Sequence, residues 1–186
     1  MSAAPAVFLD RDGVLNAAVV VDGRPHPPRS AEEMRLLPGV EDACARLRDA
    51  GFALVCVTNQ PDIARGTTSA TVVAEINTRL RRRLDLDAVA VCPHDDADGC
   101  ACRKPKPGLI LEAATRLGLD LERSVVVGDR WRDVEAGRRA GCRTVLIDHA
   151  YDEPMAVADA ISDSLSAAVS SIIRLSRRGA APRSET

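Results

Sequence analysis

Five short apolar segments, separated by longer amphipathic ones, constrain the fold of this chain more than any other feature of its sequence. The apolar runs cover residues 6–9, 52–57, 88–92, 124–127 and 143–147. Continuous apolar runs of this length are typical of strands that are buried on both faces. The intervening segments are long enough to form crossover helices. The alternation therefore predicts a Rossmann-like, three-layer α/β domain with a central, mostly parallel sheet.

The segments between the runs carry helical periodicity. We expect helices over residues 39–50, 69–86, 107–117 and 131–140. The second places Val73, Ile76 and Leu80 on one side and its arginines on the other, as a solvated helix face. Near the C-terminus, residues 158–162 are interpreted as a sixth strand and residues 164–174 as a helix, and one continuous helix is the alternative.

Length and charge place limits on the domain and its partners. A chain of 186 residues can bury a substantial core, and we expect one domain over residues 1–175. Residues 176–186 lack apolar anchors other than alanine and proline, which predicts a disordered tail. The net charge of -2 gives no global attraction for nucleic acid or membrane, and no apolar run approaches the roughly 20 residues of a membrane span. We expect a cytoplasmic protein without an obligate protein partner.

Two carboxylates, Asp10 and Asp12, directly follow the first apolar run. This position predicts that both lie at the carboxyl edge of the sheet, where open α/β folds bind ligands. Two acids so placed can divide the labour: one attacks phosphorus and forms an aspartyl phosphate, and the other protonates the leaving oxygen and then activates water. Taken alone, an Asp-x-Asp turn is often only a capping feature, so its interpretation depends on later segments.

Two later segments offer groups that bind phosphate. Thr58 and Asn59 end the second apolar run, and they either hold phosphoryl oxygens or cap the loop. Arg103 and Lys104 lie in a basic, proline-rich segment that leads into a predicted helix N-terminus, a setting that favours anions. Basic residues in such a turn are often merely solvated. Of the two, Lys104 is the preferred phosphoryl-binding cation.

A third acidic position follows the fourth apolar run. Asp129 ends this run, and Asp133 follows one helical turn later. Carboxylate oxygens suit a hard cation such as Mg²⁺, although Asp133 alone would be an ordinary first-turn helix acid. Magnesium makes chemical sense because a carboxylate that attacks an anionic phosphate needs the charge between them neutralised. The segment predicts that Asp129 binds Mg²⁺ with the support of Asp133.

The order of these segments resembles the four signature motifs of haloacid dehalogenase phosphatases, over about residues 6–148. The resemblance implies that Asp10 is the nucleophile and Asp12 the general acid/base. It also implies that Mg²⁺ is bound by Asp10, the backbone carbonyl of Asp12, and Asp129. Arg130 stands where lysine is usual in the fourth motif, and we expect it near the substrate phosphate.

A cluster of soft ligands lies between the third run and the basic segment. The predicted zinc ligands are Cys92, His94, Cys100 and Cys102. Four such ligands suit a closed, structural, tetrahedral site. A chance cluster of buried cysteines is the alternative, but acidic residues between the two pairs oppose burial. Because Arg103 and Lys104 follow directly, zinc would fix these cations without taking part in the chemistry.

The zinc segment, the Thr-Asn-Gln motif and residues 63–66 together resemble the heptose bisphosphate and histidinol phosphate phosphatase branch of that family. The resemblance implies a small phosphorylated metabolite as substrate, with a heptose bisphosphate preferred over histidinol phosphate. The spacing of the motifs leaves no room for a separate cap domain, so selectivity would depend on short loops, including a hairpin near residues 20–24. Pro61 and Asp62 depart from the small residues expected at these positions, which leaves the preferred metabolite open.

Two other classes of function remain as alternatives. A nucleic-acid 3'-phosphatase would also suit an open site, but it would need a basic groove with aromatic side chains. The chain has only one Trp, one Tyr and two Phe, which argues against this class. A protein that binds phosphorylated ligands without turnover is disfavoured by the complete set of acids at Asp10, Asp12 and Asp129.

Overall fold

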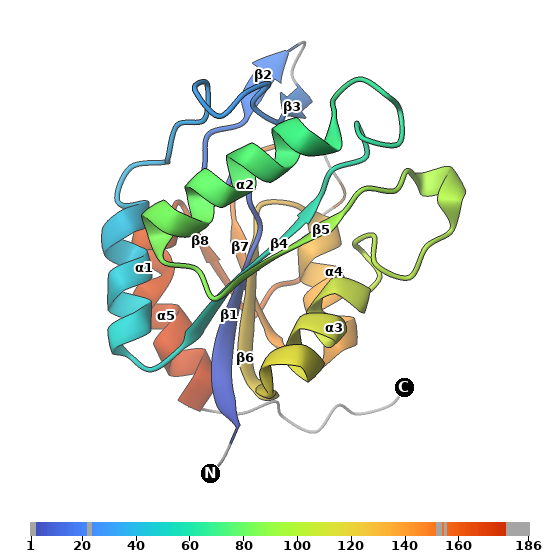
Figure 1. Cartoon of the computed structure of the whole chain (residues 1–186). Helices are drawn as coiled ribbons and strands as arrows, with labels where there is room; N and C mark the ends of the chain where they lie inside the picture. The colour runs from blue at the N-terminus through green and yellow to red at the C-terminus, as the bar shows by residue number, and fades with distance from the viewer. Residues whose placement is uncertain (1–2, 22–23, 152–153, 155, 178–186) are drawn as a thin grey trace.

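A sheet of six parallel strands forms the centre of the molecule (Figure 1). The computed structural model describes residues 3–21, 24–151, 154 and 156–177. The strands, in chain order, are β1 (Ala4–Leu9), β4 (Ala53–Asn59), β5 (Ala88–Cys92), β6 (Leu119–Gly128), β7 (Arg143–Ile147) and β8 (Ala160–Ser162). Every pairing in this sheet is parallel, which confirms the predicted α/β class.

The strand order β5-β4-β1-β6-β7-β8 reverses direction beside β1. The chain first moves outward through β4 and β5, then returns to the other side of β1 and continues through β7 and β8. Open α/β sheets bind ligands at such a reversal, outside the carboxyl ends of the strands. β6 begins earlier than the predicted 124, because Leu119 and Asp120 pair with Ala4 and Pro5 before a shift in register.

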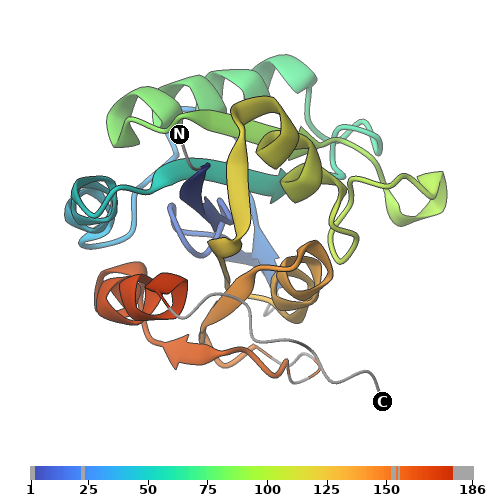
Figure 2. The same ribbon diagram turned by 90° about the horizontal axis from the view of Figure 1, so that it is seen from below.

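Helices cover both faces of the sheet, as Figures 1 and 2 show. One face is covered by α1 (Val40–Asp49), α2 (Ala70–Leu84) and α5 (Leu165–Arg177), and the other by α3 (Gly108–Leu117) and α4 (Trp131–Ala140). α2 begins where predicted, because the Ser69 hydroxyl caps it by accepting a hydrogen bond from the Val72 N–H at 3.1 Å. None of the described helices is long and apolar enough to cross a membrane.

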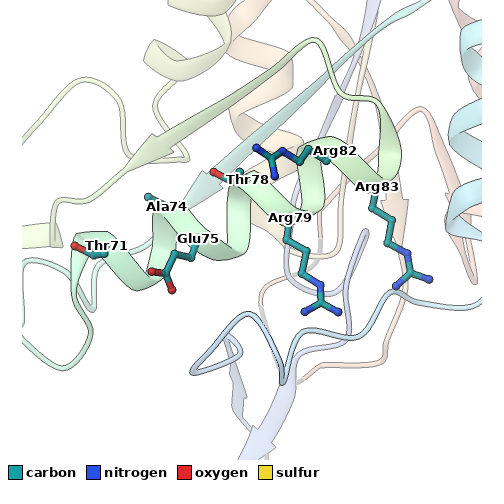
Figure 3. A pocket seen from close by; sticks show the side chains of 7 residues that line it. All are labelled: Thr71, Ala74, Glu75, Thr78, Arg79, Arg82 and Arg83. Atoms are coloured by element: carbon teal, nitrogen blue, oxygen red, sulfur yellow. The ribbon is translucent and has the colours of Figure 1, made fainter.

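The outer face of α2 carries Arg79, Arg82 and Arg83 (Figure 3). A hollow of about 580 Å³ is lined by Thr71, Ala74, Glu75, Thr78, Arg79, Arg82 and Arg83. Arg83 forms an exposed ion pair with Glu41 of α1, with 2.8 Å between Nε and Oε1. The arginines are exposed, as the helical periodicity predicts.

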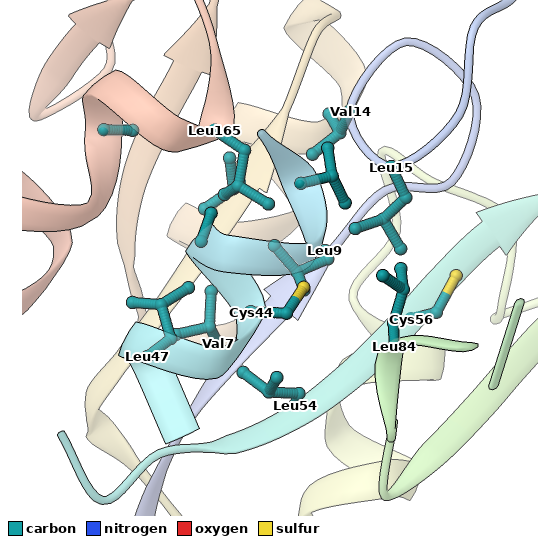
Figure 4. Packing of buried hydrophobic residues seen from close by; sticks show 14 of the residues in the cluster. Val7, Leu9, Val14, Leu15, Cys44, Leu47, Leu54, Cys56, Leu84 and Leu165 are labelled. Carbon is teal, nitrogen blue, oxygen red and sulfur yellow. The ribbon is translucent and has the colours of Figure 1, made fainter. Parts of the chain in front are cut away.

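Alternate side chains of β1 enter two separate cores. Val7 and Leu9 pack with Leu47 of α1 and Leu165 of α5, as Figure 4 shows. Phe8 lies on the opposite face, in the cluster formed with α3 and α4. Because both faces are covered, β1 is wholly apolar and rigidly held up to Leu9, the residue before Asp10.

The C-terminal segment contains both predicted elements. β8 extends the sheet by pairing Ala160 with Val145 of β7, and α5 follows, so the alternative of one continuous helix is wrong. α5 extends to Arg177, and Ser176 is buried because Leu175 and the last turn pack against the domain. The predicted tail therefore begins too early, inside this helix. Its remaining part, residues 178–186, lies outside the described residues.

A small hairpin lies at the same end of the molecule as the carboxyl ends of the strands (Figure 1). It consists of β2 (Val19–Val21) paired antiparallel with β3 (Arg24–His26), close to the predicted position. The described part of the chain between β1 and β4 otherwise holds loops and α1. No separate cap domain occurs among the described residues, which is consistent with the prediction.

Candidate active site

Three carboxylates meet where β1 and β6 end. Asp10 directly follows β1, Asp129 directly follows β6, and Asp133 lies in the first turn of α4. All three residues are buried, and an oxygen of each lies within 4.8 Å of the others. Since clustered carboxylate oxygens are the ligands of hard divalent cations, the arrangement can hold Mg²⁺.

The electrostatics of this cluster also fit a metal. Burial, reinforced by neighbouring carboxylates, raises the pKa of Asp129 to about 9. Burial also raises the pKa of Asp10 to about 6, although Lys104 opposes the shift. The Oδ1 atom of Asp129 is buried and accepts no hydrogen bond from the described residues. A buried carboxylate oxygen without a donor is costly, and a bound cation would remove this cost.

Lys104 supplies the positive charge beside the cluster. Its Nζ donates to Asp10 Oδ1 at 2.8 Å and to the Val57 carbonyl at 2.8 Å, and it lies 2.5 Å from Asp133 Oδ1. Burial alone would lower the pKa of Lys104, but the Asp10 and Asp133 carboxylates outweigh burial and raise it. Lys104 is therefore charged, and it is held where it can contact both the nucleophile candidate and an incoming anion.

Asn59 holds Lys104 by its main chain. The Asn59 side chain donates to the Lys104 carbonyl and accepts from the Lys104 N–H, both at 3.1 Å. With both ends of its amide occupied, the side chain of Asn59 acts on Lys104. Thr58 lies beside it at the end of β4, buried, where it accepts a 3.0 Å hydrogen bond from Gln60 Nε2.

The side chain of Asp12 lies apart from the three-carboxylate cluster and is surrounded by donors. Arg11 Nη2, Asn16 Nδ2 and Gln60 Nε2 each lie 2.9 Å from one of its oxygens. The carboxylate is 18% exposed, so one side of it remains open. Gln60 thus links Asp12 to Thr58.

Gly13 allows the turn after Asp12 to pack directly on Asp129. Its φ is +90°, and a Cβ at this position would lie 2.0 Å from Asp129 Oδ2. His149, which follows β7, donates from Nε2 to the Gly13 carbonyl at 2.7 Å. The turn that carries Asp10 and Asp12 is therefore fixed from the β6 side as well.

The four predicted zinc ligands are brought together. The donor atoms of Cys92, His94, Cys100 and Cys102 all lie within 4.8 Å of one another. The sulfur atoms are 3.1 to 3.7 Å apart, and His94 Nδ1 lies 3.3 Å from Cys102 Sγ. Tetrahedral zinc with Zn–S bonds of about 2.3 Å needs sulfurs about 3.8 Å apart, so the Cys92–Cys100 and Cys100–Cys102 separations suit zinc, and Cys92 and Cys102 would move apart to bind it.

The thiols of this cluster have shifted pKa values. Burial raises the pKa of Cys92 to about 12. Desolvation also opposes ionisation of Cys100, but hydrogen bonds from the Arg103 backbone and from neighbouring thiols outweigh it and lower the pKa to about 7. A thiol near neutrality suits a metal ligand, because the thiolate is the form that binds.

The zinc loop, residues 92–102, is tied to its surroundings by charged side chains. Arg103 Nε donates to Asp96 at 2.7 Å, and Arg103 Nη1 donates to the His94 carbonyl at 3.3 Å. Arg65 bonds both oxygens of Asp95 at 2.8 Å. The guanidinium of Arg103, expected on phosphate, is thus engaged within the zinc loop.

The structure brings some predicted site residues together and separates others. Asp10, Lys104, Asp129 and Asp133 form one charged cluster, whereas the side chain of Asp12 belongs to a neighbouring hydrogen-bond network. Arg130 is the N-cap of α4, and its N–H donates to Asp133 at 3.1 Å. Its positive charge opposes the rise in the pKa of Asp129.

Sequence reasoning missed several residues of this site. Arg11 and Gln60 lie within the Asp-x-Asp and Thr-Asn-Gln motifs, but spacing alone does not show that they donate hydrogen bonds to Asp12. Asn77 gave a signal that was overlooked, because it is a polar residue on the apolar face of α2. His149 gave none beyond its place after a buried strand.

Comparison with protein families and curated proteins gives a consistent result. The family model of haloacid dehalogenase-like hydrolases matches residues 17–141. A Bordetella bronchiseptica protein named D-glycero-beta-D-manno-heptose-1,7-bisphosphate 7-phosphatase is 39% identical over 149 residues, which are 76% of this chain and 79% of that protein. A Pseudomonas aeruginosa protein of the same name is 33% identical and covers 90% of this chain and 97% of its own.

Solved structures show the same similarity in three dimensions. The D,D-heptose 1,7-bisphosphate phosphatase from B. bronchiseptica, complexed with magnesium and phosphate, has a TM-score of 0.77 and 33% identity. The match covers 91% of this chain and 98% of that one. A HAD-like phosphatase candidate from Mesorhizobium loti has a TM-score of 0.76 and 33% identity, and covers 98% of this chain and 91% of its own.

Proposed function

We propose, because this chain belongs to the haloacid dehalogenase-like hydrolases, that it is a magnesium-dependent phosphatase in which Asp10 is the nucleophile. One observation carries the assignment. Asp10 lies at the reversal point of the sheet, with the ammonium of Lys104 on one oxygen and the buried, donor-free oxygen of Asp129 nearby. A carboxylate so placed has both a cation for the phosphate and a metal position beside it.

The proposed substrate is a heptose 1,7-bisphosphate, from which the phosphate at position 7 is removed. Relatives with this activity in their names are 33 to 39% identical, and the two described above span at least three quarters of this chain. The described residues contain no cap domain over the strand ends, which leaves the hairpin, the loop at residues 61–67 and the zinc loop to contact the sugar.

Two metals are part of the proposal. Asp10, Asp129 and the backbone carbonyl of Asp12 would hold Mg²⁺, with Asp133 in support, and the bound ion would neutralise charge between the carboxylate and the phosphate. The four zinc-loop ligands would hold structural Zn²⁺. We place the protein in the cytoplasm, where thiol ligands remain reduced.

The residues of the site divide the reaction into two steps. A carboxylate oxygen of Asp10 bonds phosphorus, and the bond from phosphorus to the sugar oxygen breaks. Asp12 gives its proton to that leaving oxygen and then takes a proton from the water that cleaves the aspartyl phosphate. Thr58, at the end of the strand next to β1, and Lys104 would supply a hydroxyl and an ammonium to the phosphoryl oxygens.

The test is phosphate release from heptose 1,7-bisphosphate in the presence of Mg²⁺, with histidinol phosphate and a 3'-phosphorylated oligonucleotide as competing substrates. We expect the heptose to be turned over best, with loss of the 7-phosphate shown by NMR of the product. Faster phosphate release from either competitor would overturn the assignment of the heptose as substrate. No release from any phosphomonoester would overturn the assignment of the protein as a phosphatase.

Replacing the nucleophile tests the mechanism. Asp10→Asn removes the attacking oxygen anion but retains the shape of the side chain, so we expect kcat to fall by at least about 10³-fold. Zinc content and thermal stability should remain near those of the unaltered protein. A variant that keeps more than about a tenth of the activity would show that another group attacks phosphorus.

A further inference from the structure

Arg11 is a fully buried cation beside the proposed acid/base residue. Its side chain has 0% exposure and belongs to the largest fully buried side chains of the described protein. It stands between Asp10 and Asp12 in sequence, yet the proposed reaction gives it no role. Burying a guanidinium costs several kcal/mol unless its donors are paired, so its contacts need an explanation.

The guanidinium has two edges with two different partners. Nη2 lies 2.9 Å from Asp12 Oδ2, and Nε lies 3.2 Å from the same oxygen and 3.3 Å from Oδ1. Nη1 points to another element and donates to Asn77 Oδ1 at 3.0 Å. The flat fork of arginine therefore connects the Asp12 carboxylate to helix α2, which a single ammonium cannot do.

Asn77 is a polar residue in an apolar setting, and its contact with Arg11 explains its presence there. It is only 7% exposed and lies on the apolar face of α2, close to Val73 and Leu80. A buried amide at such a position is unfavourable unless it is hydrogen-bonded. The Arg11 guanidinium is the partner of its carbonyl oxygen.

We propose that Arg11 and Asn77 are positioning residues that aim the Asp12 carboxylate at the leaving oxygen. The inference rests on the acid/base role of Asp12 proposed above. Arg11 donates to Asp12 from one side, and Asn16 and Gln60 donate to it from others. Asn77 accepts a hydrogen bond from Arg11 and so connects it to the buried face of α2. The proton passes from Asp12 to the leaving sugar oxygen as the phosphorus–oxygen bond breaks, and it is replaced from the attacking water.

Leaving-group dependence separates this role from a general effect on folding. A sugar alkoxide leaves poorly without a proton, whereas p-nitrophenolate leaves without one. Misplacing Asp12 should therefore slow heptose 1,7-bisphosphate far more than p-nitrophenyl phosphate. The ratio of the two kcat/KM values is independent of the folded fraction, because both substrates meet the same molecules.

The decisive variants are Arg11→Lys, which keeps the charge but not the fork, and Asn77→Leu, which keeps the volume but not the acceptor. We expect each to lower the ratio about 10- to 100-fold, within the range of general acid catalysis. Asn77→Asp keeps an acceptor for Nη1 and should preserve the ratio. Arg82→Lys, on the exposed face of the same helix, is the matched control and should change nothing.

Asp12→Asn is measured first, to separate the two levels of the proposal. If it leaves the ratio unchanged, the acid/base role of Asp12 is wrong, and the inference fails with it. If it lowers the ratio while Arg11→Lys and Asn77→Leu do not, Asp12 is the acid but the positioning role is wrong. Equal losses on both substrates in those two variants would likewise overturn the inference in favour of a purely structural contact.

Discussion

At the scale of single residues, Gly13 determines how closely two strand ends can approach. Its backbone has a φ of +90°, which residues with a side chain rarely adopt. The Asp129 carboxylate fills the space where a Cβ would be. The contact joins the turn after β1 to the end of β6. One missing side chain thus allows Asp10 and Asp129 to lie close enough to bind one cation together, as proposed.

Gly13→Ala should disrupt this approach. A Cβ only 2.0 Å from Asp129 Oδ2 forces that carboxylate to move, and the positive φ adds backbone strain of about 1–2 kcal/mol. We expect a fall in kcat of at least about 100-fold and weaker Mg²⁺ activation, measured by steady-state kinetics over a range of Mg²⁺ concentrations.

Gly51→Ala is the matched control for this substitution. Gly51 has nearly the same φ, +89°, but nothing lies within 4 Å of its would-be Cβ. Gly51→Ala should lose about 1–2 kcal/mol of unfolding free energy, the same backbone strain, and retain full activity. Similar kinetics in the two variants would show that strain alone, and not the contact with Asp129, explains the effect.

At the scale of elements, the zinc loop lies next in sequence to Lys104, the proposed phosphate-binding cation. Cys102 is separated from Lys104 by Arg103 alone, and Arg103 is itself bonded back to the loop. Lys106 closes the far side by donating to the carbonyls of Gly99 and Cys100. The order of this loop and the position of Lys104 are therefore coupled.

Cys102→Ser should test this coupling. We expect purified protein to hold about one zinc per chain, and the variant to lose most of it because hydroxyl is a poor zinc ligand. Activity should fall by at least about 10-fold because Lys104 is less well held. Metal analysis and kinetics measure the two effects. Cys44→Ser, at a buried cysteine in α1, should keep both zinc and activity, and zinc-free Cys102→Ser with full activity would contradict the coupling.

The elements were largely predictable from sequence, and their side-chain partners were not. The positions of Asp10, Thr58 and Asp129 at strand ends were predictable, because buried apolar runs stop where polar residues begin. The pairing of Arg103 with Asp96 could not be predicted, since it depends on the folded path of the zinc loop. The end of α5 was missed because a serine gave no sign of its burial.

The catalytic centre was similarly only half predictable. Motif order indicated which acids matter, but neither the separation of Asp12 from the other carboxylates nor the use of Asn59 on Lys104 follows from spacing. The hydrogen bonds around the site join residues far apart in sequence, 45 positions for Asn59 and Lys104 and 66 positions for Arg11 and Asn77. Such long-range geometry requires the three-dimensional structure.

At the scale of the whole molecule, the stability of the fold is linked to the charge at its centre. The raised pKa values of Asp10, about 6, and Asp129, about 9, mean that the folded protein holds these protons more tightly than the unfolded chain. Between about pH 4 and pH 9 the folded state therefore binds more protons. The contribution of this cluster to the free energy of unfolding accordingly falls as pH rises through that window.

Bound Mg²⁺ should compensate for this loss of unfolding free energy, and its effect should be larger at higher pH. Because Mg²⁺ competes with protons for Asp129, its stabilisation should grow from pH 6 to pH 8.5. At about 100 times the dissociation constant the gain would be about 2.7 kcal/mol. Thermal melts with and without Mg²⁺ at the two pH values measure it. Asp129→Asn should abolish the gain, whereas an equal gain at both pH values would contradict the competition.

The reversal of strand order beside β1 has a consequence for biosynthesis. β1 is made first, but its neighbour β6 appears more than 100 residues later, after the whole of one wing of the sheet. A nascent chain on the ribosome therefore carries Asp10 for most of its synthesis without Asp129. Contacts of such long sequence separation form late in folding. Activity would therefore appear near the end of translation, only after both halves of the sheet had come together.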